Sequence, residues 1–174
     1  RLDDTYYQYY LGRGLTYSKL GNRGKARADL ERSNQLLPTS VASNELGTLA
    51  LQEGDRDSAK KYFAAVARSE GPLRKPAMDN YIRLDIADNP SNYIQAMPTD
   101  HNGTLVATIT NTTRIPIRSA VVQFTAVING QRAEKHSTLG TVQANSRTGI
   151  SSGWHFRPDD VVENVTARVI SIQL

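Results

Sequence analysis

Two stretches of the chain share one pattern of small and large residues: residues 14–30 read GLTYSKLGNRGKARADL, and residues 47–63 read GTLALQEGDRDSAKKYF. An offset of 33 residues aligns them, with three small residues identical and two other positions apolar or aromatic in both copies. The matched pairs are Gly14 and Gly47, Tyr17 and Ala50, Gly21 and Gly54, Ala26 and Ala59, and Leu30 and Phe63. A repeat of this length predicts similar structural units that stack on one another.

Each copy predicts a helical hairpin. Gly21-Asn22 and Gly54-Asp55 are the expected turns, because glycine adopts positive φ at a helix end and Asn or Asp caps the next helix. The small residues at 14, 26, 47 and 59 would let two antiparallel helices approach closely. The expected helices are residues 10–20 and 25–36 in the first hairpin, and 42–52 and 56–68 in the second.

A fifth helix is expected to cover the open end of the second hairpin. Pro76 is a suitable first residue for it, and Asp88-Asn89-Pro90 is a suitable stop. Its expected apolar stripe consists of Met78, Ile82, Leu84 and Ile86.

The repeat resembles the tetratricopeptide repeat. The motif positions occupied in this chain are Tyr10, Gly14, Tyr17, Gly21, Ala26, Leu30 and Pro38, then Leu46, Gly47, Gly54, Ala59 and Phe63. Arg13 departs from the motif because it stands where leucine is usual, and Ser43 departs because it replaces the first aromatic residue. The resemblance implies helical hairpins whose first helices line a concave surface that binds protein.

The register of this resemblance implies which side chains line that surface. They combine aliphatic groups with amides, which suits an extended peptide or a partner helix. The candidate peptide-binding residues are Gln8, Leu11, Leu15, Ser18, Lys19, Val41, Asn44, Thr48, Leu51 and Gln52. The opposing interpretation is that these residues pack on neighbouring elements.

The second half of the chain has a periodicity of two, which predicts β-strands. Strands are expected around residues 104–110, 122–128, 132–139, 150–156 and 165–174. Asn129-Gly130 predicts a hairpin turn, and a change of phase predicts a β-bulge near Val169-Ile170. Six or seven short strands without a long helix predict an antiparallel sandwich.

Residues 106–124, with the motif Asn111-Thr-Thr, loosely resemble the FxLYD-like immunoglobulin-type domains of bacterial envelope proteins. The resemblance implies an immunoglobulin-like sandwich. The expected class is therefore α+β with two domains: two tetratricopeptide-like hairpins in 1–72, a capping helix and linker in 73–90, and the sandwich in 91–174. This order of domains resembles the trailing region of bacterial zinc metallopeptidases of the barrel-assembly-enhancing protease type.

Composition and motifs argue against several classes of function. The chain has no cysteine, no His-Glu-x-x-His motif, no Gly-x-Ser-x-Gly motif and no phosphate-binding glycine loop. His101, His136 and His155 are widely separated in the sequence. We therefore expect no catalytic residue, no metal site and no cofactor, and we expect that this chain is not itself an enzyme.

The charge pattern does not favour a nucleic-acid partner. Of 174 residues, 1–90 hold 14 basic and 12 acidic side chains, and 91–174 hold 7 and 5. The small positive excess is spread evenly, whereas a nucleic-acid surface needs clustered basic residues. The sequence also has no apolar run long enough to span a membrane.

The sequence leaves location and several roles open. The expected location is the bacterial envelope or periplasm, and the cytoplasm is the alternative. The motifs at Asn102, Asn111 and Asn164 match glycosylation acceptors but are interpreted as structural, and Trp154 is expected in the core rather than in a carbohydrate site. Because the chain starts at Arg1, we expect it to be part of a longer protein.

The leading hypothesis is a protein-interaction scaffold that binds a peptide or partner protein through the concave face. The alternative is an accessory region that positions substrates for a zinc metallopeptidase domain absent from this chain.

Overall fold

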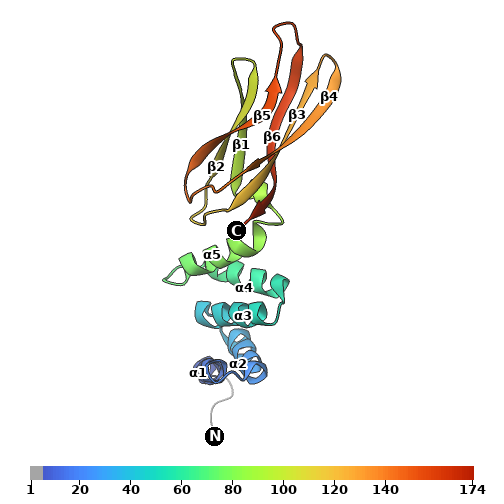
Figure 1. Cartoon of the computed structure of the whole chain (residues 1–174). Coiled ribbons are helices and arrows are strands. Elements are labelled where there is room, and N and C mark those ends of the chain that lie inside the picture. Colours follow the sequence, from blue (N-terminus) through green and yellow to red (C-terminus); the bar gives the residue numbers. More distant parts are fainter. Residues whose placement is uncertain (1–5) are drawn as a thin grey trace. The chain divides into compact units, whose positions relative to one another are not determined.

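The computed structural model describes residues 6–174, and within them five α-helices are followed by six β-strands (Figure 1). The helices are α1 (Tyr7–Lys19), α2 (Arg23–Leu36), α3 (Ser40–Gln52), α4 (Arg56–Arg68) and α5 (Arg74–Asp85). A short 3-10 turn, η1 (Pro90–Asn92), precedes β1 (Ile94–His101), β2 (Thr104–Asn111), β3 (Ser119–Ile128), β4 (Gln131–Leu139), β5 (Arg147–His155) and β6 (Val162–Gln173). The α+β class with the helices first is confirmed.

The chain divides into two compact units. The first ends at Leu84 and holds the helical hairpins, and the second spans Asp85–Leu174 and holds both sheets. We call them the helical unit and the β unit, and describe each by itself.

The two helical hairpins pack through the small residues of the repeat. A Cβ atom added at Gly14 would lie 2.8 Å from Cγ of Leu30, and one added at Gly47 would lie 2.9 Å from Cε1 of Phe63. Ala26 is completely buried beside Leu30, and Ala59 is completely buried in the second hairpin. The predicted close approach of α1 to α2 and of α3 to α4 is therefore confirmed.

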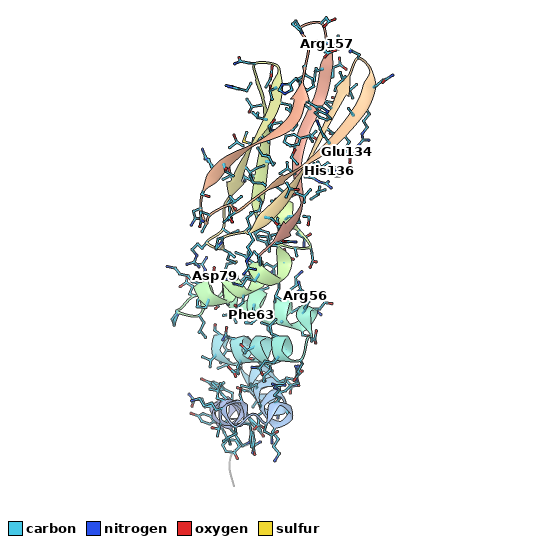
Figure 2. All side chains as sticks on the ribbon, in the orientation of Figure 1. Arg56, Phe63, Asp79, Glu134, His136 and Arg157 are labelled. Atoms are coloured by element: carbon cyan, nitrogen blue, oxygen red, sulfur yellow. The ribbon has the colours of Figure 1, made fainter. Side chains whose placement is uncertain are left out.

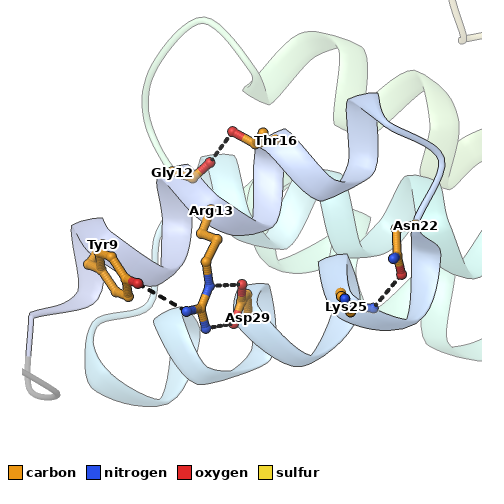
Figure 3. Close-up of polar contacts among 7 residues, drawn as sticks. All are labelled: Tyr9, Gly12, Arg13, Thr16, Asn22, Lys25 and Asp29. Atoms are coloured by element: carbon orange, nitrogen blue, oxygen red, sulfur yellow. Dashed lines mark hydrogen bonds and ion pairs between the residues drawn. The ribbon is translucent and has the colours of Figure 1, made fainter.

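The helix ends follow local capping chemistry. The side chain of Asn22 accepts a hydrogen bond from the backbone N–H of Lys25 at 3.2 Å (Figure 3), and Thr39 accepts one from Ala42 at 3.1 Å. The Thr39 cap places the start of α3 at Ser40, two residues before the expected position. The expected start of the first helix at residue 10 is wrong, because α1 already begins at Tyr7.

Asp55 caps α4 and supplies a pH-dependent contribution to stability. Its carboxylate accepts hydrogen bonds from the Ser58 side chain and backbone, which lower the pKa of Asp55. A carboxyl group with a lowered folded-state pKa stabilises the protein above its unfolded pKa and loses that effect as the pH falls through the folded value.

We therefore expect acidification below about pH 4 to destabilise the wild-type helical unit more than an Asp55→Asn variant, which keeps a capping oxygen but does not titrate. Urea unfolding followed by circular dichroism over a pH series measures the difference. Parallel pH profiles for the two proteins would contradict the assignment.

Helix α5 covers the second hairpin, as expected, and three of the four residues of the expected apolar stripe are buried. Ala77 and Leu84 join the buried cluster formed by α3 and α4, and Tyr81 packs against it. This spacing places Ala77, Tyr81 and Leu84 on one side of the helix. The expected place of Met78 in the apolar stripe is wrong, since Met78 is 37% exposed, whereas Ile82 and Ile86 are buried.

The start of α5 also differs from the expectation at Pro76. The helix begins at Arg74, and Pro76 lies in its first turn, where the missing N–H removes no intrahelical hydrogen bond. At the other end, the Arg56 side chain at the start of α4 (labelled in Figure 2) donates a hydrogen bond to the backbone carbonyl of Leu84, with a donor–acceptor distance of 2.8 Å.

The β unit consists of two three-stranded antiparallel sheets, ordered β1-β2-β5 and β4-β3-β6 (Figure 1). Asn129 and Gly130 form the turn between β3 and β4, with φ values of 50° and 78° that suit a tight hairpin. The predicted bulge is confirmed, because Val121 pairs with Ser171 while Val122 pairs with Val169, which leaves Ile170 unpaired. A second bulge lies near Asn164, between the pairs Thr125–Thr166 and Val127–Glu163.

Strand β1 was not predicted, because Pro98 and several polar residues interrupt the alternation of apolar and polar residues that indicates a strand. It lies at the edge of its sheet and pairs only with β2. The two-residue turn between His101 and Thr104 fixes the register of β1 against β2. In this register the backbone nitrogen of Pro98 points away from β2, so no N–H is needed there for strand pairing.

The β unit buries an organised polar group beside its apolar core. Asn111 is completely buried, and its amide nitrogen donates to the carbonyls of Ile115 at 2.8 Å and Gln143 at 3.1 Å. Its carbonyl oxygen accepts from the backbone N–H of Thr113 at 3.0 Å and from the Thr113 hydroxyl at 2.8 Å. The Asn-x-Thr motif therefore shapes the loop that follows β2.

Trp154 is half-buried rather than fully enclosed. Its ring lies 6.3 Å from that of Phe156, with a tilted arrangement. Ile150 and Phe156, at alternate positions of the same segment, are also half-buried.

Candidate functional site

The ten candidate peptide-binding residues lie on α1 and α3, the first helices of the two hairpins. Five of them are exposed: Gln8, Lys19, Val41, Leu51 and Gln52. The other five are half-buried: Leu11, Leu15, Ser18, Asn44 and Thr48. We call these ten residues the α1–α3 face.

A hydrogen bond connects the two helices within this face. The hydroxyl of Ser18 on α1 donates to the carboxylate of Glu45 on α3, and both side chains are half-buried. Glu45 contacts the face through this bond but is not among the residues that the repeat register assigned to it. The contact brings the two rows of candidate residues together and adds an acidic group.

Two of the candidates have a second role in packing. Leu11 and Leu15 contact the buried cluster that includes Leu30, Leu46 and Leu49. Substitution of either leucine would remove buried apolar contact as well as surface. Leu51, which is 38% exposed, and Val41, which is 44% exposed, are the aliphatic side chains of the face most accessible to a partner.

The polar candidates differ in whether their side chains form hydrogen bonds within the protein or are exposed to solvent. The hydroxyl of Thr48 donates to the carbonyl of Asn44 in its own helix at 3.1 Å. Gln8, Lys19 and Gln52 are exposed at the surface. The face can therefore supply amide donors and acceptors and one ammonium group next to accessible aliphatic surface.

Arg13, the departure from the repeat motif, makes an ion pair with a buried partner (Figure 3). Its Nε and Nη2 atoms each donate to an oxygen of Asp29 at 2.6 Å, and Nη1 donates to the Tyr9 hydroxyl at 3.0 Å. The guanidinium also lies over the rings of Tyr9 and Tyr10, with its Cζ atom 5.0 and 5.6 Å from the ring centroids. The hydrogen bond to Asp29 raises the pKa of Arg13 above its ordinary value, so the side chain stays charged.

This cluster replaces the leucine contact expected at position 13 with a paired charge between α1 and α2. Asp29 is only 7% exposed, so its carboxylate depends on Arg13 for compensation. We interpret the cluster as a structural connection between the two helices rather than as part of the α1–α3 face.

His101 on β1 and His155 on β5 both lie opposite Thr104 of β2, whereas His136 lies on β4 in the other sheet. His136 Nε2 lies 3.1 Å from an oxygen of Glu134 on the same strand (Figure 2), and His155 Nδ1 lies 2.9 Å from the Thr104 hydroxyl. His101 is exposed at the end of β1. Within residues 6–174, no three His, Cys, Asp or Glu side chains are grouped so that they could hold a metal ion.

Comparison with known families supports the helical part of this description. The sequence model of the tetratricopeptide repeat matches residues 7–38, which cover α1 and α2. This match, together with the hairpins, supports a general role in protein–protein interaction. None of the helices described here is of a length and apolarity that would cross a bilayer.

A search of curated proteins finds no match. Among solved structures, E. coli curli protein CsgC aligns with 44% of this chain and 83% of its own, at 18% sequence identity and a TM-score of 0.25.

Proposed function

We propose that the chain is a non-catalytic interaction module that binds an extended peptide or a partner helix through the α1–α3 face. The observation that supports this most directly is the row of α3 side chains at positions 41, 44, 48 and 51, where exposed aliphatic groups flank an amide and a hydroxyl. Val41 and Leu51 are ten residues apart, which corresponds to about 15 Å along a helix. That length accommodates about five residues of an extended peptide.

The chemistry of the face agrees with this kind of partner. Amide groups such as that of Gln52 can bond a peptide backbone in either direction, and Leu51 and Val41 can receive apolar side chains. Lys19 adds a positive charge and Glu45 a negative one. Because these charges have opposite sign, a strongly charged partner gains little electrostatic binding energy. The proposed ligand is therefore an apolar segment with modest charge.

Leu51→Asp is the substitution that tests the proposal. Peptides selected from a phage-displayed random library on the intact chain provide the probe. The variant should weaken their binding by at least about tenfold, because a charge then replaces an apolar contact. Fluorescence anisotropy with the synthetic peptides measures the effect.

Leu37→Asp provides the matched control, since Leu37 is similarly exposed, at 46%, but follows α2 outside the α1–α3 face. Its affinity should equal that of the wild type. If both variants bind as tightly as the wild type, the face does not bind these peptides. Equal weakening by the control would also contradict the proposal.

The alternative role, positioning of substrates for a zinc peptidase domain, uses the same face and is supported only by the order of helical hairpins before paired sheets. It would require that Leu51→Asp also slow cleavage of the selected peptides by any protein that joins this chain to such a peptidase domain. Cleavage that is unaffected by the substitution would remove this alternative and leave the binding role.

A further inference from the structure

Between the edge strands β1 and β6, the inward-facing residues of the β unit are buried at one end of the core and accessible to solvent at the other. Burial of the inward positions of β1 decreases from Ile94, which is 1% exposed, through the half-buried Pro98 to the exposed Asp100. On β6, burial decreases from Val169 to the half-buried Val165 and Val162. Because β1 and β6 are antiparallel edges of different sheets, these less buried ends meet on one side of the sandwich.

A cleft of about 770 Å³ occupies this opening. Leu105 and Phe156 line it together with Pro98 on β1 and with Val162 and Val165 on β6. A cleft of this volume can hold a ligand, and its walls present apolar and polar groups in about equal amounts.

Hydrogen bonds hold the rim of the cleft in place. The backbone N–H of Phe156 donates to the carbonyl of Gly103 at 2.6 Å. Asp160 accepts from the backbone N–H of Arg157 at 2.8 Å and from the amide nitrogen of Asn129 at 2.9 Å. These hydrogen bonds lower the pKa of Asp160, and the bond from the Arg157 backbone has the largest effect. The cleft is therefore formed before any ligand arrives, which reduces the entropic cost of binding.

The charges at the cleft favour a basic neighbour for the apolar group that enters it. Arg157 and Asp160, in the loop before β6, contribute one charge of each sign to the lining (Figure 2 labels Arg157). The exposed carboxylate of Asp100, on the β1 side, adds a second negative charge, so the lining carries two carboxylates and one guanidinium. A lysine or arginine of the ligand would be attracted to it.

The strands that form the walls favour a polypeptide over a lipid or another small amphiphile. Both are edge strands, and the register of β1 turns the backbone groups of Ala96 and Asp100 away from β2. Such groups can bond a peptide main chain but gain nothing from hydrocarbon. Pro98 and the bulges of β6 interrupt each edge, so side-chain insertion rather than a long added strand would supply most of the affinity.

We propose that this cleft binds an extended segment of a partner polypeptide, with one large apolar side chain between Leu105 and Val165 and a Lys or Arg beside Asp100. The site is independent of the α1–α3 face and of the function proposed for it.

Three capped synthetic peptides test the proposal against the intact, isotope-labelled chain by NMR titration. The first carries one phenylalanine followed by one lysine in a serine–threonine background, the second replaces the phenylalanine with serine, and the third replaces the lysine with glutamate. We expect saturable shifts at the amides of residues 99–105 and 156–165 with the first peptide, and binding at least about tenfold weaker with the other two.

Val165→Glu should abolish these shifts, because a charged side chain would occupy the cleft. Val161→Glu is the matched control: Val161 is 59% exposed and outside the cleft lining, so binding should be unchanged. Asp100→Lys should reverse the preference from the lysine peptide to the glutamate peptide without affecting the core.

Four results would overturn the proposal. The first is equal binding of all three peptides or of none, and the second is unchanged binding by Val165→Glu with a correctly folded β unit. The third is shifts confined to α1 and α3, which Leu51→Asp would remove and which would assign the peptides to the helical unit. Saturable binding of the fluorescent amphiphile ANS in the cleft, without peptide binding, would also overturn it by assigning the cleft to a small molecule.

Discussion

Replacing Phe63 with alanine is expected to destabilise the helical unit by about 3–5 kcal/mol, as is usual for a buried phenylalanine. Phe63 is completely buried and contacts a cluster of residues from α3, α4 and α5. Its ring also fills the space beside Gly47, where no side chain is present. The truncation would leave a cavity at the centre of the second hairpin. Urea unfolding monitored by circular dichroism at 222 nm, a helix-sensitive wavelength, measures the loss.

A double-mutant cycle distinguishes this specific contact from general loss of apolar surface. Gly47→Ala alone should destabilise the unit by about 1–3 kcal/mol, because its Cβ would overlap the Phe63 ring. Combined with Phe63→Leu, the same substitution should cost less, with a coupling energy of about 1 kcal/mol. Additive effects would contradict the close packing of Gly47 on Phe63. Leu37→Ala, at an exposed position, provides the control and should change stability little.

Replacing Asn111 with leucine is expected to destabilise the β unit by about 3 kcal/mol or more, because several buried polar groups would lose their partners. The carbonyls of Ile115 and Gln143 would lose an amide donor, and the backbone N–H of Thr113 would lose an acceptor. Leucine has a similar size but restores none of these bonds. Thermal unfolding followed by the fluorescence of Trp154, the one tryptophan of the chain, reports on this unit.

Asn111→Asp separates the loss of the donor from the loss of the whole side chain. An ionised carboxylate would face the carbonyl oxygens of Ile115 and Gln143, so its folded-state pKa should be raised. The variant should therefore regain stability, relative to the wild type, as the pH falls and the carboxyl group becomes a donor. A constant difference in stability across the acidic range would contradict this role of the amide nitrogen.

The helical hairpins could be predicted from sequence because their packing depends on residue size at fixed intervals. Gly14 and Gly47 have no side chain where the facing helix passes, and this requirement leaves a repeat that can be read directly. The Asn129-Gly130 turn and the bulge at Ile170 were predictable for a similar reason, since each depends on local conformation or on a change in phase.

Other features depend on contacts between distant residues. Arg13 looked like a departure from the repeat until Asp29, 16 residues away, was seen to compensate its charge. Strand β1 was missed because an edge strand tolerates proline and polar residues that a central strand excludes. Met78 was misassigned because the buried face of α5 is determined by the cluster it covers, not by the hydrophobicity of each residue.

The candidate sites show the same division. The α1–α3 face could be listed from the repeat register, but the packing role of Leu11 and Leu15 and the participation of Glu45 required coordinates. The cleft of the β unit could not be predicted, because its residues come from strands whose hydrophobic alternation is the same whether the core is closed or open.

The imperfect edges of the two sheets have a consequence for the behaviour of the protein at high concentration. Proline in β1 and the two irregularities in β6 interrupt one edge of each sheet, so a strand from a neighbouring molecule cannot form a continuous ladder at those two edges. The same irregularities that limit self-assembly leave room for short, selective contacts with other chains.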